Sequence, residues 1–391
     1  MTFRQAAPSR PLHVTDSVHR PQPYRAARRG ALLALALLAA CQNSTRSSTA
    51  AIGIGIGAVP GSPGYTSITQ GVELALEQLK AEGATFRLRA PTADARTAVQ
   101  VAQQLSGDDA VLAVIGHPES GNTLETVPVY ADAAHDGANG VVILSPTATS
   151  PRLTGVSPWF FRVAPSDADV ARFAATWVID SLKARRAAVI YRNDSYGRDW
   201  TETFARTFAA SGEIVVREPY LTGAVEWDAY AALLAKVRPD VVLFPGDADD
   251  ALALIQSLRE LNVSIPFVGG DGTEAIKRAA DAEGAHYVTF FSAAQASGTE
   301  AERFLARYRE RFHTDPDYFA AQAYDATLVI GRTATRGART RTALRLALEK
   351  VGSAAPAIDG AGGPIGFRGN HDVQARRLFV ARVAPIAEGA P

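Results

Sequence analysis

The clearest pattern along the chain is a pair of short apolar runs, each followed by a polar loop. The runs are Val111–Ile115 and Val141–Leu144, and Leu124–Ala134 between them has apolar residues at helical spacing. A strand, a helix and a second strand in this order favour a parallel pair with a right-handed crossover. The loops HPESGNT and SPTATSP follow the two runs. Because parallel sheets bind ligands beyond the carboxyl ends of their strands, we expect both loops to face one crevice.

The same alternation continues on both sides of this unit. Ile52–Val59 predicts a buried strand and Gly71–Ala81 an amphipathic helix. Strands and helices alternate again beyond Phe160–Pro165, which predicts a second lobe of the same kind. Near the end, the pattern predicts a helix over Thr273–Ala282 and a hairpin over Ile365–Val383. The expected fold class is therefore α/β, with two doubly wound lobes.

Composition narrows the possible functions. The 391 residues favour two lobes, and 40 basic against 40 acidic residues give zero net charge, which does not point to a nucleic-acid partner. A single cysteine excludes an intramolecular disulfide. With seven histidines and no HExxH or Cys/His spacing, we predict no metal site and no cofactor.

The only cysteine follows a short apolar run near the N-terminus. Arg28-Arg29-Gly30 precedes Ala31–Ala40, a run too short to span a bilayer but typical of a secretory signal. Leu38-Ala39-Ala40-Cys41 resembles the bacterial lipoprotein box. We therefore expect a signal peptide over residues 1–41, lipidation at Cys41, a flexible tether over residues 42–51, and a periplasmic or cell-surface location. The alternative is a buried free cysteine that follows an apolar run by chance.

The two polar loops carry the candidate chemistry. Ser120, Thr147 and Thr149 are compact donor–acceptors suited to a small polar ligand, and loop amides suit an anionic group. The alternative is that both loops are ordinary turns. An enzyme is not expected: Pro60 replaces the third glycine of a dinucleotide-binding loop, and Pro118 the first glycine of a nucleophile elbow.

Several segments together resemble one protein family. In chain order they include AVIGHPESGNT, VILSPTATSPRLT, FFRVAPSD, AAVIYRNDSYGRDW, VGGDGTE and GPIGFRGNHD. Their order and spacing over residues 52–383 resemble the periplasmic binding proteins of the branched-chain amino acid (Leu/Ile/Val) type, the solute receptors of ABC importers.

The resemblance implies a type I periplasmic binding protein, with two Rossmann-like lobes joined by a three-crossing hinge that closes like a flytrap. The crossings would lie near Phe161–Pro165, Phe291–Ala294 and Ala355–Gly363. The N-terminal lobe would comprise residues 52–163 plus 293–355, and the C-terminal lobe residues 164–292 plus 362–384.

The implied function is that of a monomeric solute-binding lipoprotein. It would hold an amino acid or similar compound in the interlobe cleft and present it to the permease and ATPase subunits of an ABC importer. The alternative is a ligand-sensing or scaffold lipoprotein of the same fold that feeds no transporter.

The resemblance also assigns roles to individual positions. Ser120 matches a contact to the ligand α-carboxylate, Thr147 a backbone contact beside it, and Thr149 a hydroxyl on the α-ammonium. Tyr65 and Tyr196 match aromatic walls from opposite lobes. Asp271 falls where relatives place a carboxylate against the ammonium, a charge-assisted pairing.

Asp247 lies where this sequence departs from the family. The loop Gly246–Asp250 is acidic where relatives often carry bulky groups, so Asp247 is a further candidate ligand contact that would favour a polar or cationic side chain. The alternative is that these carboxylates only begin the following helix, where the helix dipole favours them.

Overall fold

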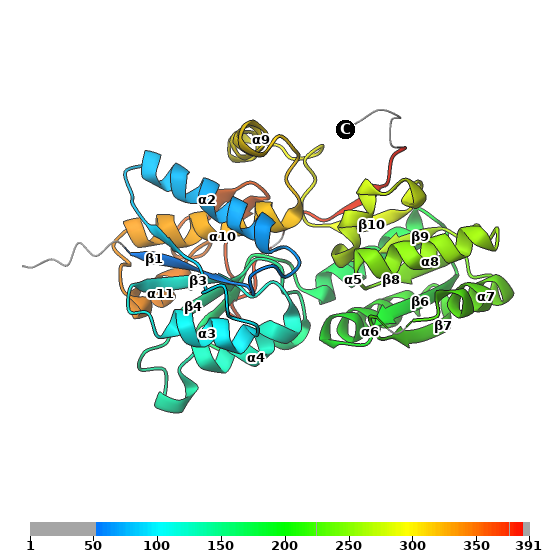
Figure 1. The fold of residues 1–391 in the computed structure, drawn as a ribbon, viewed down its shortest axis with the longest axis horizontal. Coiled ribbons are helices and arrows are strands. Elements are labelled where there is room, and N and C mark those ends of the chain that lie inside the picture. The colour runs from blue at the N-terminus through cyan, green and yellow to red at the C-terminus, as the bar shows by residue number, and fades with distance from the viewer. Residues whose placement is uncertain (1–51, 224, 375, 386–391) are drawn as a thin grey trace, which may run out of the picture. The chain divides into compact units, whose positions relative to one another are not determined.

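Two mainly parallel sheets organise the part of the chain that the computed structural model describes, residues 52–223, 225–374 and 376–385. The first is entirely parallel and has the strand order β2-β1-β3-β4-β5 (Figure 1). Its strands are β1 (Gly53–Gly57), β2 (Arg87–Arg89), β3 (Val111–Gly116), β4 (Val142–Ser145) and β5 (Phe160–Arg162).

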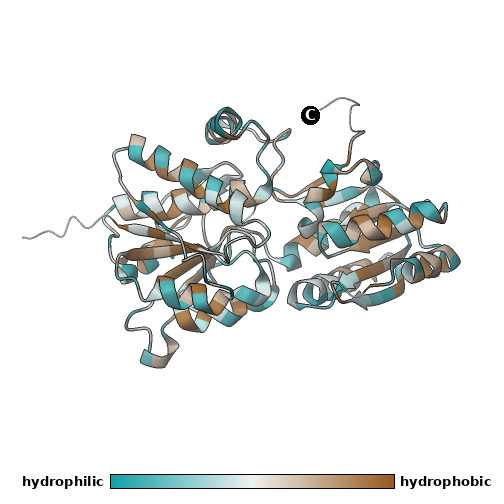
Figure 2. Ribbon diagram, viewed as in Figure 1, coloured by the Kyte–Doolittle hydropathy of each residue, from teal (hydrophilic) through white to brown (hydrophobic). Residues whose placement is uncertain are grey.

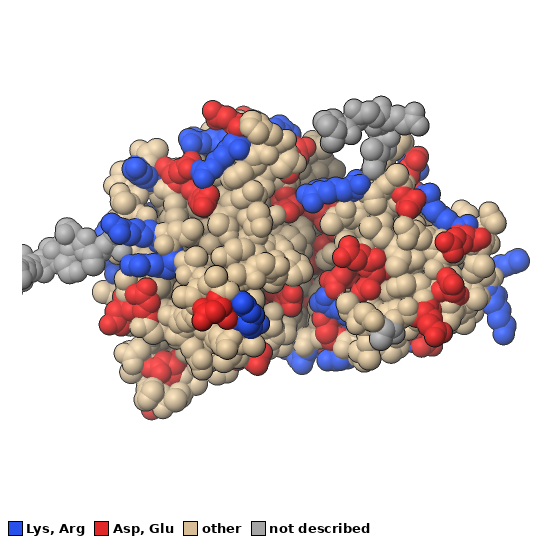
Figure 3. Space-filling view, viewed as in Figure 1, with Lys and Arg blue, Asp and Glu red and all other residues tan. Residues whose placement is uncertain are grey.

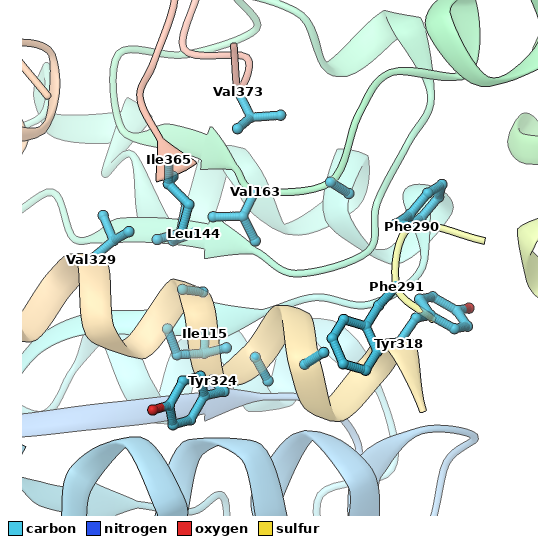
Figure 4. Packing of buried hydrophobic residues seen from close by; sticks show 14 of the residues in the cluster. Ile115, Leu144, Val163, Phe290, Phe291, Tyr318, Tyr324, Val329, Ile365 and Val373 are labelled. Atoms are coloured by element: carbon cyan, nitrogen blue, oxygen red, sulfur yellow. The ribbon is translucent and has the colours of Figure 1, made fainter. Parts of the chain in front are cut away.

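Helices cover both faces of this first sheet because successive strand residues point to opposite sides. Ile115 and Leu144 pack with one group of helices, and Val114 and Ile143 with the other. The first group is α2 (Tyr65–Ala81), α10 (Tyr318–Thr335) and α11 (Arg341–Leu348); the second is α3 (Ala98–Ser106) and α4 (Ser120–Tyr130). In Figure 4, Tyr324 and Val329 of α10 lie with Ile115 and Leu144 in the buried cluster.

The second sheet repeats the arrangement. Its order is β13-β10-β9-β8-β6-β7, so five parallel strands have the relative order of the first sheet and one strand is added at the edge. The strands are β6 (Arg186–Arg192), β7 (Glu213–Tyr220), β8 (Val241–Phe244), β9 (Phe267–Gly269), β10 (His286–Thr289) and the antiparallel β13 (Phe379–Arg382).

The second sheet is also covered on both faces. Val189 and Leu243 pack with α5 (Asp167–Asp180) and α6 (Ser195–Phe208). Ile190 and Phe244 pack with α7 (Trp227–Val237) and α8 (Ala248–Glu260). Figure 2 shows the result, with hydrophobic strands and helices whose outer faces are more hydrophilic. Helix α9 (Thr299–Phe312) packs through Phe304 and Tyr308 into the larger core. The predicted α/β class, with two doubly wound lobes, is confirmed.

Three predicted helices differ from the structure. The helix expected over Gly71–Ala81 begins six residues earlier, at Tyr65. The helix expected over Leu124–Ala134 begins earlier, so α4 takes in much of the loop after β3; its continuation at Ala133–His135 is a 3₁₀ turn. The helix expected over Thr273–Ala282 is two 3₁₀ stretches, Asp271–Arg278 and Ala280–Ala282. Ala279 between them is extended (φ −110°, ψ 126°), which interrupts any α-helical bonding.

The hairpin predicted over Ile365–Val383 forms only in its first half, where Phe367 and Val373 make an antiparallel bridge. The flanking strands pair elsewhere: β12 (Gly363–Ile365) pairs with the preceding β11 (Ile358–Gly360), and β13 pairs with β10. Arg376 Nη2 donates to Asp325 of α10 at 2.6 Å, which holds the chain at the first sheet until just before β13. We therefore propose that the third crossing lies between Arg376 and Phe379. The other lobe boundaries stay predictions.

The N-terminal predictions fall outside the described residues. Residues 1–41 with Cys41, and the tether over residues 42–51, belong to the part of the chain that is not described. Within residues 52–385, apart from the two gaps, no helix is both long and apolar enough to cross a membrane.

Candidate functional site

The loops after β3 and β4 are bonded to one another. Ser145 Oγ donates to the carbonyl of His117 at 2.7 Å, and Thr147 Oγ1 donates to that of Pro118 at 2.9 Å. In return, Ser120 Oγ accepts the N–H groups of Thr149 at 3.2 Å and of Ser150 at 3.1 Å. The expectation that both loops lie together at the carboxyl edge of the sheet is confirmed. All three predicted hydroxyl residues, Ser120, Thr147 and Thr149, are buried there.

Ser120 is also the first residue of α4. The first N–H groups of an α-helix have no acceptor within the helix, and together with the helix dipole they favour an anion. The side chain of the preceding Glu119 does not cap them. A carboxylate can therefore be bound at this helix end.

A second group of candidates lies at the carboxyl edge of the second sheet. Tyr196 follows β6, Asp247 follows β8 and Asp271 follows β9. The Tyr196 hydroxyl donates to Asp271 Oδ1 at 2.9 Å, and both side chains are buried. Burial raises the pKa of Asp271 to about 6, although the Tyr196 hydrogen bond favours the charged form.

Contacts join these two groups. The N–H of Asp167, the first residue of α5, donates to the carbonyl of Thr149 at 2.7 Å. Asp199 on α6 accepts a short hydrogen bond from Ser150 Oγ and one of 3.0 Å from Arg152 Nε. The hydroxyl loops therefore contact α6, which also carries Tyr196, and Asp167, which lies close enough to Asp271 for the Asp271 charge to raise its pKa. The loops and the Tyr196–Asp271 pair border the same region.

Asp247 is engaged by an arginine. Arg192 Nη1 donates to Asp247 Oδ2 at 2.5 Å, and Arg192 Nη2 lies 2.6 Å from Asp194 Oδ2. Asp247 immediately precedes α8 without capping it through its side chain. Because Asp247 already has a cationic partner in Arg192, which it shares with Asp194, it is a weaker candidate for a cationic ligand group than Asp271.

Tyr65 differs from the other candidates in its contacts. It is the first residue of α2, is half-buried, and packs against the larger hydrophobic core. Among the described residues, no hydrogen bond connects it to the other predicted positions.

The family of this chain follows from its match to a protein-family model. Residues 58–390 match the model described as periplasmic binding protein. The chain belongs to this family. Its predicted resemblance to the Leu/Ile/Val type is also confirmed by homologues with that name.

Two relatives show how similar this periplasmic binding protein is in sequence to other proteins. The Leu/Ile/Val-binding protein BraC3 of Rhizobium johnstonii is 26% identical over 299 residues, covering 73% of this chain and 75% of that protein. An amino acid binding protein of Pseudomonas aeruginosa is 30% identical over 199 residues, 49% of this chain. That match spans only half the length of the Pseudomonas protein.

Solved structures share the fold. The branched-chain amino acid transporter substrate binding protein LivJ from Streptococcus pneumoniae, in complex with isoleucine, is 24% identical with a TM-score of 0.75, covering 86% of this chain and 97% of that one. A solute binding protein from R. palustris in complex with benzoate is 19% identical with a TM-score of 0.74, covering 85% and 93%. At these identities the likeness concerns the fold alone.

Sequence reasoning missed one acidic residue in this binding protein. Asp167 is fully buried, and neither carboxylate oxygen has a hydrogen-bond partner among the described residues. Burial, and then the neighbouring Asp271, raise the pKa of Asp167 well above its usual value. The Thr149 side chain, which lies near this carboxylate without making a hydrogen bond of ordinary geometry, and the charge of Arg162 offset the rise only in part. Its sequence context, FFRVAPSD, looks like an ordinary acidic helix start, so only the fold distinguishes it.

The binding protein's charges are otherwise mixed. On the face seen in Figure 3, acidic and basic side chains are interspersed. Within the described part of the chain, no group of three His, Cys, Asp or Glu side chains is placed to hold a metal ion.

Proposed function

We propose that this protein is the extracytoplasmic solute-binding component of an ABC importer and that it binds an amino acid or an amino-acid-like compound. One observation carries the proposal: a helix N-terminus suited to an anion borders the same region as a buried carboxylate suited to a cation. Ser120 begins that helix and Asp271 supplies that carboxylate. An amino acid presents both charges within one small molecule.

Ser120 is suited to bind the ligand carboxylate. Its oxygen already accepts two backbone N–H groups, so its own O–H remains as a donor. An O–H donated to a carboxylate makes a charge-assisted bond, about twice as strong as a neutral one. In the proposal Thr147 contributes backbone contacts beside it.

Asp271 is proposed to bind the ligand ammonium with the help of Thr149. Tyr196 fixes the Asp271 carboxylate through the 2.9 Å hydrogen bond and adds an aromatic surface. Tyr65 is proposed as a second aromatic wall, and Asp247 as a peripheral contact whose charge Arg192 already matches.

The remaining parts of the proposal concern partners and location. We infer that Cys41 is lipidated, that the protein acts as a monomer outside the cytoplasm, and that it presents its ligand to a permease with ATPase subunits. Support comes from the lipoprotein-box sequence and from membership of the family. No catalytic step is part of this function.

A thermal-shift screen of the purified full-length protein tests the binding step. Amino acids, amides and small organic acids form the panel, and a ligand at 100 times its Kd adds about 2.7 kcal/mol of stability. A raised Tm with amino acids is expected. No shift across the panel would remove the proposal, and shifts only with acids that lack an ammonium would remove the role of Asp271.

A measurement of ligand uptake by cells distinguishes an importer component from a sensing protein. Cells lacking the gene should lose uptake of the radiolabelled ligand found in the screen. Unchanged uptake would favour the sensing or scaffold alternative.

A further inference from the structure

Asp167 is placed in the candidate site by its backbone. Its N–H donates to the carbonyl of Thr149 at 2.7 Å, which holds the start of α5 against the loop that Ser120 also bonds. Its side chain is fully buried, and within the described residues both carboxylate oxygens lack a hydrogen-bond partner. Burying an ionised carboxylate without a partner costs free energy unless a cation or a proton neutralises its charge.

Arg162, the arginine whose charge acts on Asp167, is engaged elsewhere. Arg162 Nε donates to Asp372 Oδ1 at 2.7 Å, and its Nη1 and Nη2 donate to the Ser150 carbonyl at 2.9 Å and to Thr154 Oγ1 at 2.8 Å. Arg152 bonds Asp199. Arg162 therefore cannot give Asp167 a full ion pair.

Two other groups near the site have partners of opposite charge. Arg192 is shared by the two carboxylates of Asp194 and Asp247. Glu274 accepts from Lys277 Nζ and from Thr289 Oγ1, each at 2.6 Å. Asp167 and Asp271 are thus the two buried carboxylates of the site that lack a cationic partner among the described residues.

We propose that Asp167 and Asp271 form a two-carboxylate subsite that receives two cationic centres, so that the ligand is an amino acid with a positively charged side chain. This inference rests on the proposed function. The α-ammonium matches the charge of one carboxylate, and an ammonium or guanidinium on the side chain matches the other. The ligand carboxylate remains for Ser120 and the N-terminus of α4.

The subsite also predicts proton release. Burial, and then repulsion from Asp271 and Asp199, raise the pKa of Asp167 well above its usual value. A cationic side chain beside Asp167 favours the ionised form and lowers that pKa again, so ligand binding releases protons to solvent. Calorimetric binding enthalpies should therefore depend on the ionisation enthalpy of the buffer.

Matched ligand pairs test the inference in the full-length protein by titration calorimetry at pH 7.5. Lysine and norleucine have similar size but differ in side-chain charge, as do arginine and citrulline. Lysine or arginine should bind at least tenfold more tightly than its neutral counterpart. Asp167→Asn should remove that preference while changing norleucine binding less than about twofold. Asp180→Asn, an exposed acid at the end of the same helix, should change neither.

The outcomes separate this inference from the function it rests on. Equal affinity for lysine and norleucine in the unaltered protein would overturn it, whether or not Asp167→Asn folds. An equal loss of both ligands in Asp167→Asn would overturn it too, because Asp167 would then serve the α-ammonium or the fold. Binding of neutral amino acids alone leaves the proposed function standing, whereas no binding of any amino acid overturns both.

Discussion

Among single residues, Ser120 connects structure and proposed ligand most directly, because its oxygen accepts two N–H groups of the second loop while its O–H remains as a donor. We predict that Ser120→Ala weakens binding of the amino acid ligand tenfold or more, since a hydrogen bond to a charged group contributes about 1.5–3 kcal/mol. Titration calorimetry measures the change. Ser211→Ala, at an exposed position, is the control and should bind normally. Unchanged affinity in Ser120→Ala would contradict the assigned role.

Asp271 gives a prediction about pH. With its pKa raised to about 6, Asp271 loses its charge as the pH falls through 6, so affinity for an ammonium ligand should fall by up to tenfold per pH unit below that value. For a ligand with a neutral side chain such as norleucine, which leaves Asp167 without a cation, Asp271→Asn should bind weakly at every pH and remove this dependence. Calorimetry between pH 7.5 and 5 measures it, and a flat profile in the unaltered protein would rule out ammonium binding at Asp271.

Protonation of Asp271 has opposite effects on ligand affinity and on stability: acidification weakens ligand binding but stabilises the folded protein. An unfolded aspartate ionises near pH 3.9, whereas the folded Asp271 keeps its proton up to about pH 6. The folded state therefore binds more protons than the unfolded state in that window. Acidification from pH 7 towards 4 should raise the free energy of unfolding by about 3 kcal/mol through Asp271. Comparing urea denaturation of the unaltered protein with Asp271→Asn isolates this contribution.

Between elements, the contact of α2 with α10 is unusually close. A Cβ added at Gly71 of α2 would lie 2.2 Å from the carbonyl oxygen of Ala320, so the two helices can approach only because Gly71 lacks a side chain. We predict that Gly71→Ala destabilises the protein by about 1–3 kcal/mol, the usual cost of overpacking, despite the better helix propensity of alanine. Urea denaturation measures this.

Gly121 in α4 is the matched control for that substitution. A Cβ there would meet no atom within 4 Å, so Gly121→Ala should be neutral or slightly stabilising. Equal effects of the two substitutions would show that helix propensity, and not the α2–α10 contact, decides the result.

Elements with strong local patterns were predictable from the sequence. The strands predicted over Val111–Ile115 and Val141–Leu144 match β3 and β4 to within one residue at each end, because each is an apolar run ended by a polar loop. The start of α4 was missed because Ser120, Gly121 and Asn122 have low helix propensity; hydrogen bonds to the loop after β4 help to hold Ser120 in place. β13 was misassigned because its partner, β10, lies some ninety residues earlier in the chain.

Some features of the candidate site were also predictable from the sequence, and others were not. Ser120, Thr147 and Thr149 follow strand ends, so topology alone placed them together. The pairing of Arg192 with Asp247, and the isolation of Asp167, depend on residues far apart in sequence. Local patterns contain no information about either, so these features emerged only from the fold.

At the scale of the whole molecule, the lipid anchor determines where the protein acts. We predict that the full-length protein sediments with membranes and that Cys41→Ser moves it to the soluble fraction, because a tethered domain without its acyl chains has no comparable membrane affinity. Fractionation followed by immunoblotting measures this. The variant should still bind ligand, and sedimentation of Cys41→Ser with membranes would contradict the anchor.

Because α10 and β13 lie near the C-terminal end of the sequence, they determine when each sheet can be completed during synthesis. The strands of the first sheet are all made by Arg162, but α10, which covers one face, ends only at Thr335. At about 5–20 residues per second the nascent chain waits roughly 10–35 s for that cover, with apolar strand surface unprotected. The edge of β10 waits longer still, until Phe379–Arg382 is released close to the end of translation. Neither half can therefore finish folding before nearly the whole chain has been made.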